Sequence, residues 1–173
     1  MLELNIDSEL SIPQLLTRAE ITAKTTVEKL KARSVTLALA ESCTAGMISS
    51  LLAEVPGASN VLWGSFVCYT KEAKILMLDL KSEELGAYGL VSKETACSMA
   101  LGAMNKSGAD IGVSVTGLAG PLGDGSGAAV GTVWIACANS AKTEHKEHHF
   151  TGSRNAVRIR AAIAALEMID MLI

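Results

Sequence analysis

The sequence predicts an α/β sandwich built on a mixed β-sheet. Segments with helical spacing alternate with short apolar or β-branched runs, which is typical of α/β folds. The last two runs are separated by a short polar turn, as in an antiparallel hairpin. The chain has 173 residues, of which 49% are hydrophobic. This length and composition predict one domain, residues 1–173, with a single large core.

The first half of the chain alternates between the two patterns. Pro13 suits the first turn of a helix, and apolar residues recur behind it at three- and four-residue spacing. The continuous apolar run VTLALA is typical of a strand covered on both faces. In chain order we expect a helix at 11–33, a strand at 35–40, a helix at 45–55, a strand at 61–70 and short helices near 71–78 and 82–87.

The second half continues the alternation. Ser92 predicts a helix N-cap, and Gly108 the end of that helix. Ser153 predicts the cap of a last helix that runs to about Leu172. Between these helices we expect a strand at 110–116, a glycine-dense loop at 117–131, a strand at 132–138 and a more polar partner strand at 143–150.

Charge and cysteine content exclude several protein classes. A net charge of -3 offers no general attraction for nucleic acid or anionic membranes. The four cysteines lie far apart without a CxxC pair, which favours a reducing compartment. No stretch reaches the roughly 18 apolar residues of a membrane span, and the first ten residues carry acids rather than a signal peptide's basic flank. We therefore expect a cytoplasmic protein; the sequence leaves a homo-oligomer open.

Polar loops follow three of the predicted strands. They read ESCTAG after the first strand, YTKEAK after the second and TGLAGP after the third. Ligands of open α/β sheets bind outside the carboxyl ends of the strands. The three loops would form one site if the strands are neighbours with a common direction. The direction of the second strand stays open at this point.

Ser42 is the first candidate for chemistry. At a strand-to-helix turn, the N–H groups and dipole of the following helix would favour negative charge on an attacked carbonyl oxygen. A plain N-cap of helix 45–55 is the structural alternative. Cys43 is an alternative nucleophile, because a helix N-terminus also favours a thiolate.

A lysine is the natural base for this serine, because no histidine occurs in the three loops. Burial lowers the pKa of a lysine and makes its amine a proton acceptor. Both Lys71 and Lys74 follow the second strand, and either one could also be a solvated surface residue. Tyr69 could relay a proton or position a substrate, or simply end the strand with a wet hydroxyl.

Nucleotide and metal signals are weak. The loop 117–131 lacks the phosphate-binding GxxxxGK[ST] pattern, although its backbone N–H groups could approach a phosphate beside Arg154. The histidines lie in the polar strand KTEHKEHHF without Cys, Asp or Glu at ligand spacing. We expect a solvated edge strand there and no metal site. The histidines are His145, His148 and His149.

Five segments together resemble one known family. They are LALAESCTAG, CYTKEAK, SVTGLAGP, VGTVW and FTGSR, and they occur in the order found in the CinA C-terminal domain. The resemblance covers nearly the whole chain from about Ala19 onward. It implies a three-layer α/β/α sandwich with a mixed sheet, in the form that occurs without a fused molybdopterin-binding-like domain.

The resemblance also implies an activity. Members of the family hydrolyse the carboxamide of nicotinamide mononucleotide to nicotinate mononucleotide and ammonia, in pyridine nucleotide salvage and without a cofactor. A non-catalytic module that senses the same nucleotide is the alternative, and a structural interaction domain is a third. Ala45 departs from the glycine of many members, and the segment 124–129 lacks their Lys-Pro pair.

Residue roles follow from the matched motifs. The catalytic serine of the family falls on Ser42, and its tyrosine and lysine on Tyr69 and Lys74. This match favours Lys74 over Lys71. The resemblance implies that the substrate is contacted by Cys43, Thr44, Thr116, Gly117 and Arg154.

Overall fold

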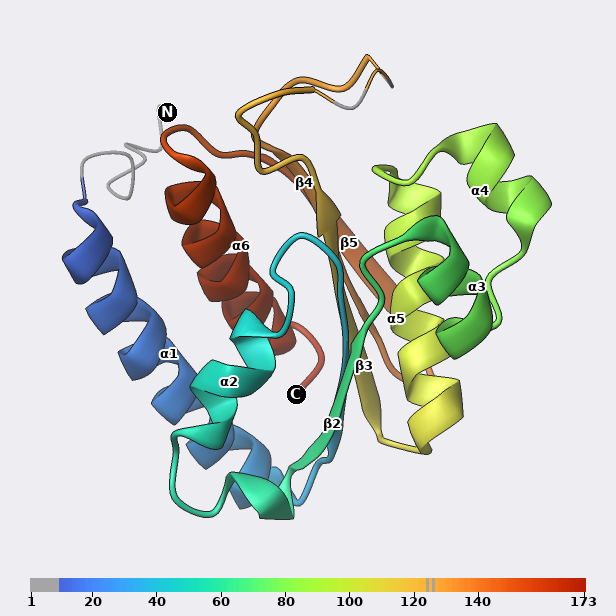
Figure 1. Cartoon of the computed structure of the whole chain (residues 1–173). Helices are drawn as coiled ribbons and strands as arrows, with labels where there is room; N and C mark the ends of the chain where they lie inside the picture. Colours follow the sequence, from blue (N-terminus) through green and yellow to red (C-terminus); the bar gives the residue numbers. More distant parts are fainter. Residues whose placement is uncertain (1–9, 124, 126) are drawn as a thin grey trace.

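The computed structural model describes residues 10–123, 125 and 127–173 and forms a three-layer α/β/α sandwich (Figure 1). Six α-helices, one 3-10 helix and five strands occur in this part of the chain. In chain order they are α1 (Ile12–Arg33), β1 (Leu37–Glu41), α2 (Met47–Ala53), η2 (Ala58–Asn60), β2 (Leu62–Val67), α3 (Lys71–Leu78), α4 (Ser82–Tyr88), α5 (Lys93–Ser107), β3 (Ile111–Gly117), β4 (Thr132–Ala138), β5 (Thr143–His149) and α6 (Arg154–Ile169).

The sheet is mixed, as predicted. Its strand order is β2-β1-β3-β4-β5. Strand β1 pairs in parallel with both β2 and β3, whereas β4 pairs antiparallel with β3 and β5. The second predicted strand thus runs parallel to the first and third. The carboxyl ends of β2, β1 and β3 meet at one edge, which brings the three polar loops together.

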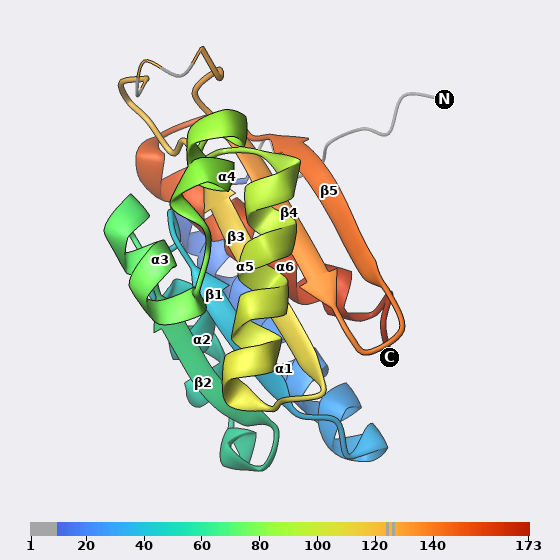
Figure 2. The same ribbon diagram turned by 90° about the vertical axis from the view of Figure 1, so that its right-hand side faces the viewer.

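Alternation along the strands separates two cores. In β1, Leu37 and Leu39 face the layer of α1, α2 and α6, whereas Ala38 and Ala40 face the layer that contains α5. Figure 2 shows α5 running along the sheet, with α4 beside it and with α1 and α6 behind the strands. Because both faces are covered, β1 and β3 are buried along nearly their whole length.

Small residues let α5 approach the sheet closely. A Cβ at Gly112 would lie 2.1 Å from the carbonyl oxygen of Ala100, so only glycine fits at this point. Two residues along, Ser114 Oγ donates to the carbonyl of Ala96 at 2.6 Å. This contact satisfies a hydroxyl that would otherwise be costly to bury.

The predicted helix caps are present. The hydroxyls of Ser92 and Ser153 accept hydrogen bonds from the N–H groups of Thr95 and Ala156. The helix predicted at 45–55 instead begins at Met47, because Ala45 and Gly46 have φ values of 51° and 89°.

Residues with such positive φ cannot belong to an α-helix. The interpretation of Ala45 as a helix start is therefore wrong. Other bounds moved by a few residues only: the first strand begins at Leu37, the second spans Leu62–Val67 and the last helix ends at Ile169.

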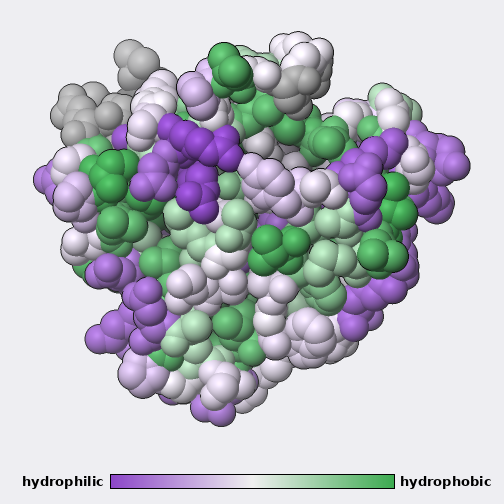
Figure 3. Space-filling model, viewed as in Figure 1, coloured by the Kyte–Doolittle hydropathy of each residue, from purple (hydrophilic) through white to green (hydrophobic). Residues whose placement is uncertain are grey.

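The two edges of the sheet differ in character. Strand β5 carries charged and histidine side chains and is solvated, as expected for a polar edge strand. The surface over β2 is mostly pale to hydrophobic, whereas hydrophilic residues gather over α1 and α4 (Figure 3). Among the helices that the structure describes, none combines the length and apolar character needed to cross a membrane.

Candidate active site

A pocket of about 220 Å³ opens where β1 and β3 end. Its walls come from the three polar loops, from the connection between α4 and α5, and from the start of α6. The structure thus brings segments that are far apart in the sequence to one place. The lining residues are Ser42, Cys43, Tyr69, Lys74, Leu90, Val91, Thr116, Gly117, Leu118, Ala119, Gly120, Leu122 and Arg154.

Lys74 and Ser42 are in direct contact inside this pocket. The Nζ of Lys74 lies 2.9 Å from the Oγ of Ser42 and donates a second hydrogen bond to the carbonyl of Cys68 at 2.8 Å. The lysine is only 1% exposed. Burial lowers its pKa below the ordinary value, which makes the neutral amine more available as a proton acceptor. Lys71, by contrast, is partly exposed and does not line the pocket.

Ser42 is not a helix cap. The N-cap of α2 is Gly46, and the Ser42 hydroxyl contacts Lys74 rather than an N–H group of that helix. The backbone N–H of Ser42 donates to the carbonyl of Val115 at 3.0 Å, which extends the pairing of β1 with β3. The rigid end of the sheet therefore positions this serine.

Cys43 is poorly suited to act as the nucleophile. Its side chain is 5% exposed, and burial raises the pKa of the thiol to about 11. The charges of Lys74 and Arg158 act in the opposite direction but do not cancel the burial. A thiol with such a pKa is almost entirely protonated near neutral pH. The geometry therefore favours the Ser42 hydroxyl over its neighbour.

Glu41 has a role that the sequence analysis missed. Its carboxylate is fully buried and accepts hydrogen bonds from the N–H groups of Ile48 and Ser49 and from Ser65 Oγ, each at 3.0 Å. The first free N–H groups of α2 are therefore already occupied. The expectation that this helix offers donors to an oxyanion is wrong for these two groups. The sequence held one signal for this role, because Glu41 is an acidic residue at the end of an otherwise apolar strand.

Tyr69 and Arg154 form part of the pocket rim. The guanidinium of Arg154 donates to the Tyr69 hydroxyl at 2.7 Å and to the carbonyl of Gly120 at 2.6 Å. The Tyr69 side chain is about half exposed. Its hydroxyl contacts Arg154 rather than Ser42 or Lys74. Arg154, at the start of α6, thus links the loops that follow β2 and β3, next to the opening of the pocket.

The remaining candidate contacts differ in their placement. Thr116 lines the pocket, and its hydroxyl donates to the carbonyl of Leu90 at 2.7 Å. A Cβ at Gly117 would lie 2.7 Å from the carbonyl of Thr132, so glycine is needed there. Thr44 is fully buried and does not belong to the pocket lining. The structure therefore gives Thr44 no place in the wall of the pocket.

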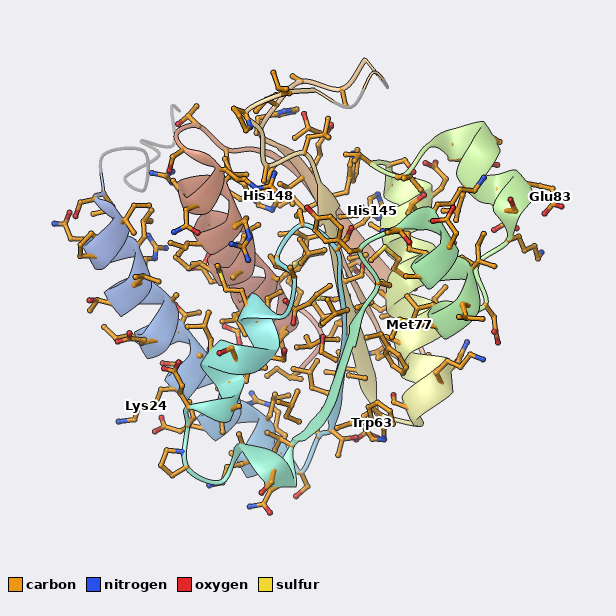
Figure 4. All side chains as sticks on the ribbon, viewed as in Figure 1. Lys24, Trp63, Met77, Glu83, His145 and His148 are labelled. Carbon is orange, nitrogen blue, oxygen red and sulfur yellow. The ribbon has the colours of Figure 1, made fainter. Side chains whose placement is uncertain are left out.

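The histidines lie away from the pocket, on β5. His145 stacks on Trp134 and His148 on Phe150. Both histidines, which are labelled in Figure 4, belong to β5, the edge strand opposite β2. Trp63, also labelled there, lies near the start of β2, at the opposite end from the site. Among the described residues, no group of three or more His, Cys, Asp or Glu side chains could hold a metal ion.

Comparison with known proteins identifies the family. The profile of the CinA C-terminal domain matches residues 19–173, which include every loop of the pocket. The chain belongs to the CinA C-terminal domain family. A CinA-like protein of Syntrophomonas wolfei is 43% identical over 133 residues, which cover 77% of this chain and 32% of the relative. A CinA-like protein of Thermotoga maritima is 45% identical over 143 residues, or 82% and 34%.

Solved structures of the CinA superfamily share the fold. The competence/damage-inducible protein CihA from Agrobacterium tumefaciens has a TM-score of 0.86 at 36% identity, covering 90% of this chain and 95% of that one. A CinA superfamily protein from Escherichia coli has a TM-score of 0.87 at 28% identity, covering 100% and 95%. The chain spans about a third of the length of the curated relatives it matches.

Proposed function

We propose that this CinA domain is an amidohydrolase that deamidates nicotinamide mononucleotide to nicotinate mononucleotide and ammonia. The contact of 2.9 Å between Lys74 Nζ and Ser42 Oγ carries the proposal. A serine becomes a nucleophile when a base accepts its proton, and a buried lysine with a lowered pKa is such a base. The activity and substrate come from the resemblance to the family.

The reaction proceeds through a covalent intermediate. The neutral amine of Lys74 accepts the proton of Ser42 as its Oγ attacks the carboxamide carbon. The resulting ammonium of Lys74 returns the proton to the amide nitrogen, and ammonia leaves as the C–N bond breaks. Water then attacks the nicotinoyl ester while Lys74 accepts its proton. The ester C–O bond breaks, Ser42 Oγ takes the proton back from Lys74, and nicotinate mononucleotide is released. Tyr69 helps to position the substrate at the rim of the pocket, where its hydroxyl accepts a hydrogen bond from Arg154.

The lining of the pocket suits this substrate. Apolar side chains of Leu90, Leu118 and Ala119 offer contacts for a pyridine ring. Arg154 lies at the start of α6, and an arginine can hold a phosphate with charge-assisted hydrogen bonds. The ring would lie inside the pocket, with its carboxamide near Ser42 and the phosphate near Arg154.

Release of ammonia tests the proposal. The wild-type chain should release ammonia from nicotinamide mononucleotide without added metal, while Ser42→Ala should have no activity but keep its fold and bind the nucleotide. Binding without turnover by the wild type would instead support the alternative, a nucleotide-sensing module. A Ser42→Ala variant with a near-normal rate would exclude this serine as the nucleophile.

A further inference from the structure

The turn that carries Ser42 is held from outside by Arg158. This residue of α6 donates from Nε to the carbonyl of Cys43 at 3.1 Å and from Nη2 to the carbonyl of Thr44 at 2.8 Å. It lies one helical turn after Arg154, so both arginines share a face of α6. One arginine contacts the rim of the pocket, and the other contacts the nucleophile turn.

The turn needs such support because its conformation is unfavourable. Ala45 adopts φ 51°, in the left-handed region that residues other than glycine rarely occupy. A conformation of this kind persists only where the surroundings enforce it. The two carbonyl contacts of Arg158 restrain the peptide groups immediately before Ala45.

Peptide geometry links these contacts to the opposite side of the turn. In a trans peptide the carbonyl of one residue and the N–H of the next point in opposite directions. Because Arg158 binds the carbonyl of Cys43, the N–H of Thr44 points away from the arginine. In the described part of the chain, this N–H and that of Cys43 donate to no acceptor of another residue.

Other donors near Ser42 are occupied. The N–H of Ser42 itself donates to Val115, and that of Ala45 donates to the carbonyl of Ser42. Ile48 and Ser49 donate to Glu41. Of the two remaining N–H groups, that of Thr44 belongs to a fully buried residue outside the pocket lining, whereas Cys43 lines the pocket next to Ser42. The N–H of Cys43 is therefore the donor left for a negatively charged oxygen formed beside Ser42.

We propose that Arg158 is a positioning residue, which fixes the turn so that the N–H of Cys43 serves as the oxyanion hole for attack by Ser42. The inference rests on the proposed serine mechanism. The planar fork of arginine spans two adjacent carbonyls, whereas the single ammonium of lysine cannot reproduce that geometry. Arg158 acts through the backbone and does not line the pocket.

Kinetics of Arg158→Lys and Arg158→Met test the role. We expect kcat for nicotinamide mononucleotide to fall about 100-fold, because small misplacements of catalytic groups have effects of that size, while KM changes less than about threefold. Arg18→Met is the matched control. Arg18 belongs to α1 and donates to Glu167 of α6 at 2.8 Å, far along α6 from the turn that carries Ser42. This replacement should leave kcat unchanged. Thermal unfolding verifies that all variants are folded.

A reversible inhibitor separates positioning from a general structural effect. Pyridine-3-carboxaldehyde forms a hemiacetal with a nucleophilic serine, and the oxyanion of this adduct needs the hole. Unreacted nicotinamide mononucleotide bound to Ser42→Ala has a neutral carbonyl and needs the hole far less. The Arg158 variants should lose aldehyde affinity in step with kcat, whereas adding Arg158→Met to Ser42→Ala should leave the affinity for nicotinamide mononucleotide unchanged. Equal losses of both affinities, or an unchanged kcat, would overturn the inference.

Binding of the aldehyde can be measured without turnover, so it tests the oxyanion hole independently of the proposed substrate. If the wild type bound the aldehyde through Ser42 and Arg158 but released no ammonia from the mononucleotide, the proposed substrate would be wrong and the oxyanion hole would stand. If the wild type did not bind the aldehyde more tightly than Ser42→Ala does, the oxyanion hole would be excluded.

Discussion

Replacing Lys74 by methionine tests the base directly. Methionine fills a similar buried volume but cannot accept a proton, so the Ser42 hydroxyl loses its partner at 2.9 Å. A positioned general base contributes about 10²–10⁴-fold to a rate. Because the proposed mechanism uses Lys74 in both the attack and the later hydrolysis, we expect kcat/KM to fall about 10³-fold or more. Lys74→Arg should be equally inactive, since a guanidinium stays protonated near neutral pH.

The assay is ammonia release between pH 6 and 9, with Lys71→Met as the control. Lys71 begins the same helix but is partly exposed and lies outside the pocket lining, so its replacement should change the rate less than about twofold. In the wild type, kcat/KM should rise with pH as Lys74 loses its proton and then level off. A Lys74→Met enzyme that kept a tenth of the rate, or a Lys71→Met enzyme that lost as much, would refute the assignment.

Stability gives an independent check of the same residue. Burial lowers the pKa of Lys74 in the folded state below its ordinary value of 10.5, so above the lowered pKa the unfolded chain binds more protons than the folded one. The free energy of unfolding of the wild type should therefore rise with pH from that lowered pKa towards 10.5. Lys74→Met should lack this rise, as measured by urea unfolding at several pH values. An identical pH dependence in both proteins would contradict the burial argument.

Three further predictions concern other parts of the molecule. Arg154→Ala should lower kcat/KM for nicotinamide mononucleotide about 10- to 100-fold, because one charge-assisted contact is lost. It should leave kcat/KM for free nicotinamide unchanged. Equal losses of kcat/KM for the two substrates would exclude recognition of the phosphate by Arg154. Activity should survive EDTA, and a loss restored by zinc would overturn the serine mechanism. Burial, with Lys146 and His149 nearby, lowers the pKa of His148 from 6.5 to about 4. The free energy of unfolding should therefore fall by about 1–2 kcal/mol between pH 7 and 4, after allowance for partial exposure. Urea unfolding of His148→Phe should not show this fall, and an unchanged fall would assign it to other groups.

Local signals in the sequence predicted most of the fold. The caps at Ser92 and Ser153 and the hairpin of β4 and β5 follow from side-chain chemistry within a few residues, and the structure confirms them. The start of α2 was misplaced because Ala45 carries no sign of its positive φ. A glycine at this position would have signalled the turn, since glycine tolerates that conformation.

The site was predictable only in part. The loops after the strands indicated Ser42 and a nearby lysine, but the choice of Lys74 over Lys71 depended on the family resemblance. In the structure this choice follows from the helix face: Lys74 and Leu78, four residues apart, are the buried residues of α3. Arg158 was missed because its contacts with Cys43 and Thr44 join positions 115 and 114 residues apart. No periodicity within one element reports such a contact.

Alternation at the end of β1 explains how the site and the fold depend on each other. Glu41 and Ser42 are adjacent, so their side chains point to opposite faces of the sheet. Glu41 therefore meets the start of α2 and fixes that helix, while Ser42 meets Lys74 of α3. Inserting or deleting one residue in β1 would exchange these two faces. It would bury the hydroxyl against α2 and direct the carboxylate at the lysine, where an ion pair would hold the amine protonated and unable to act as a base.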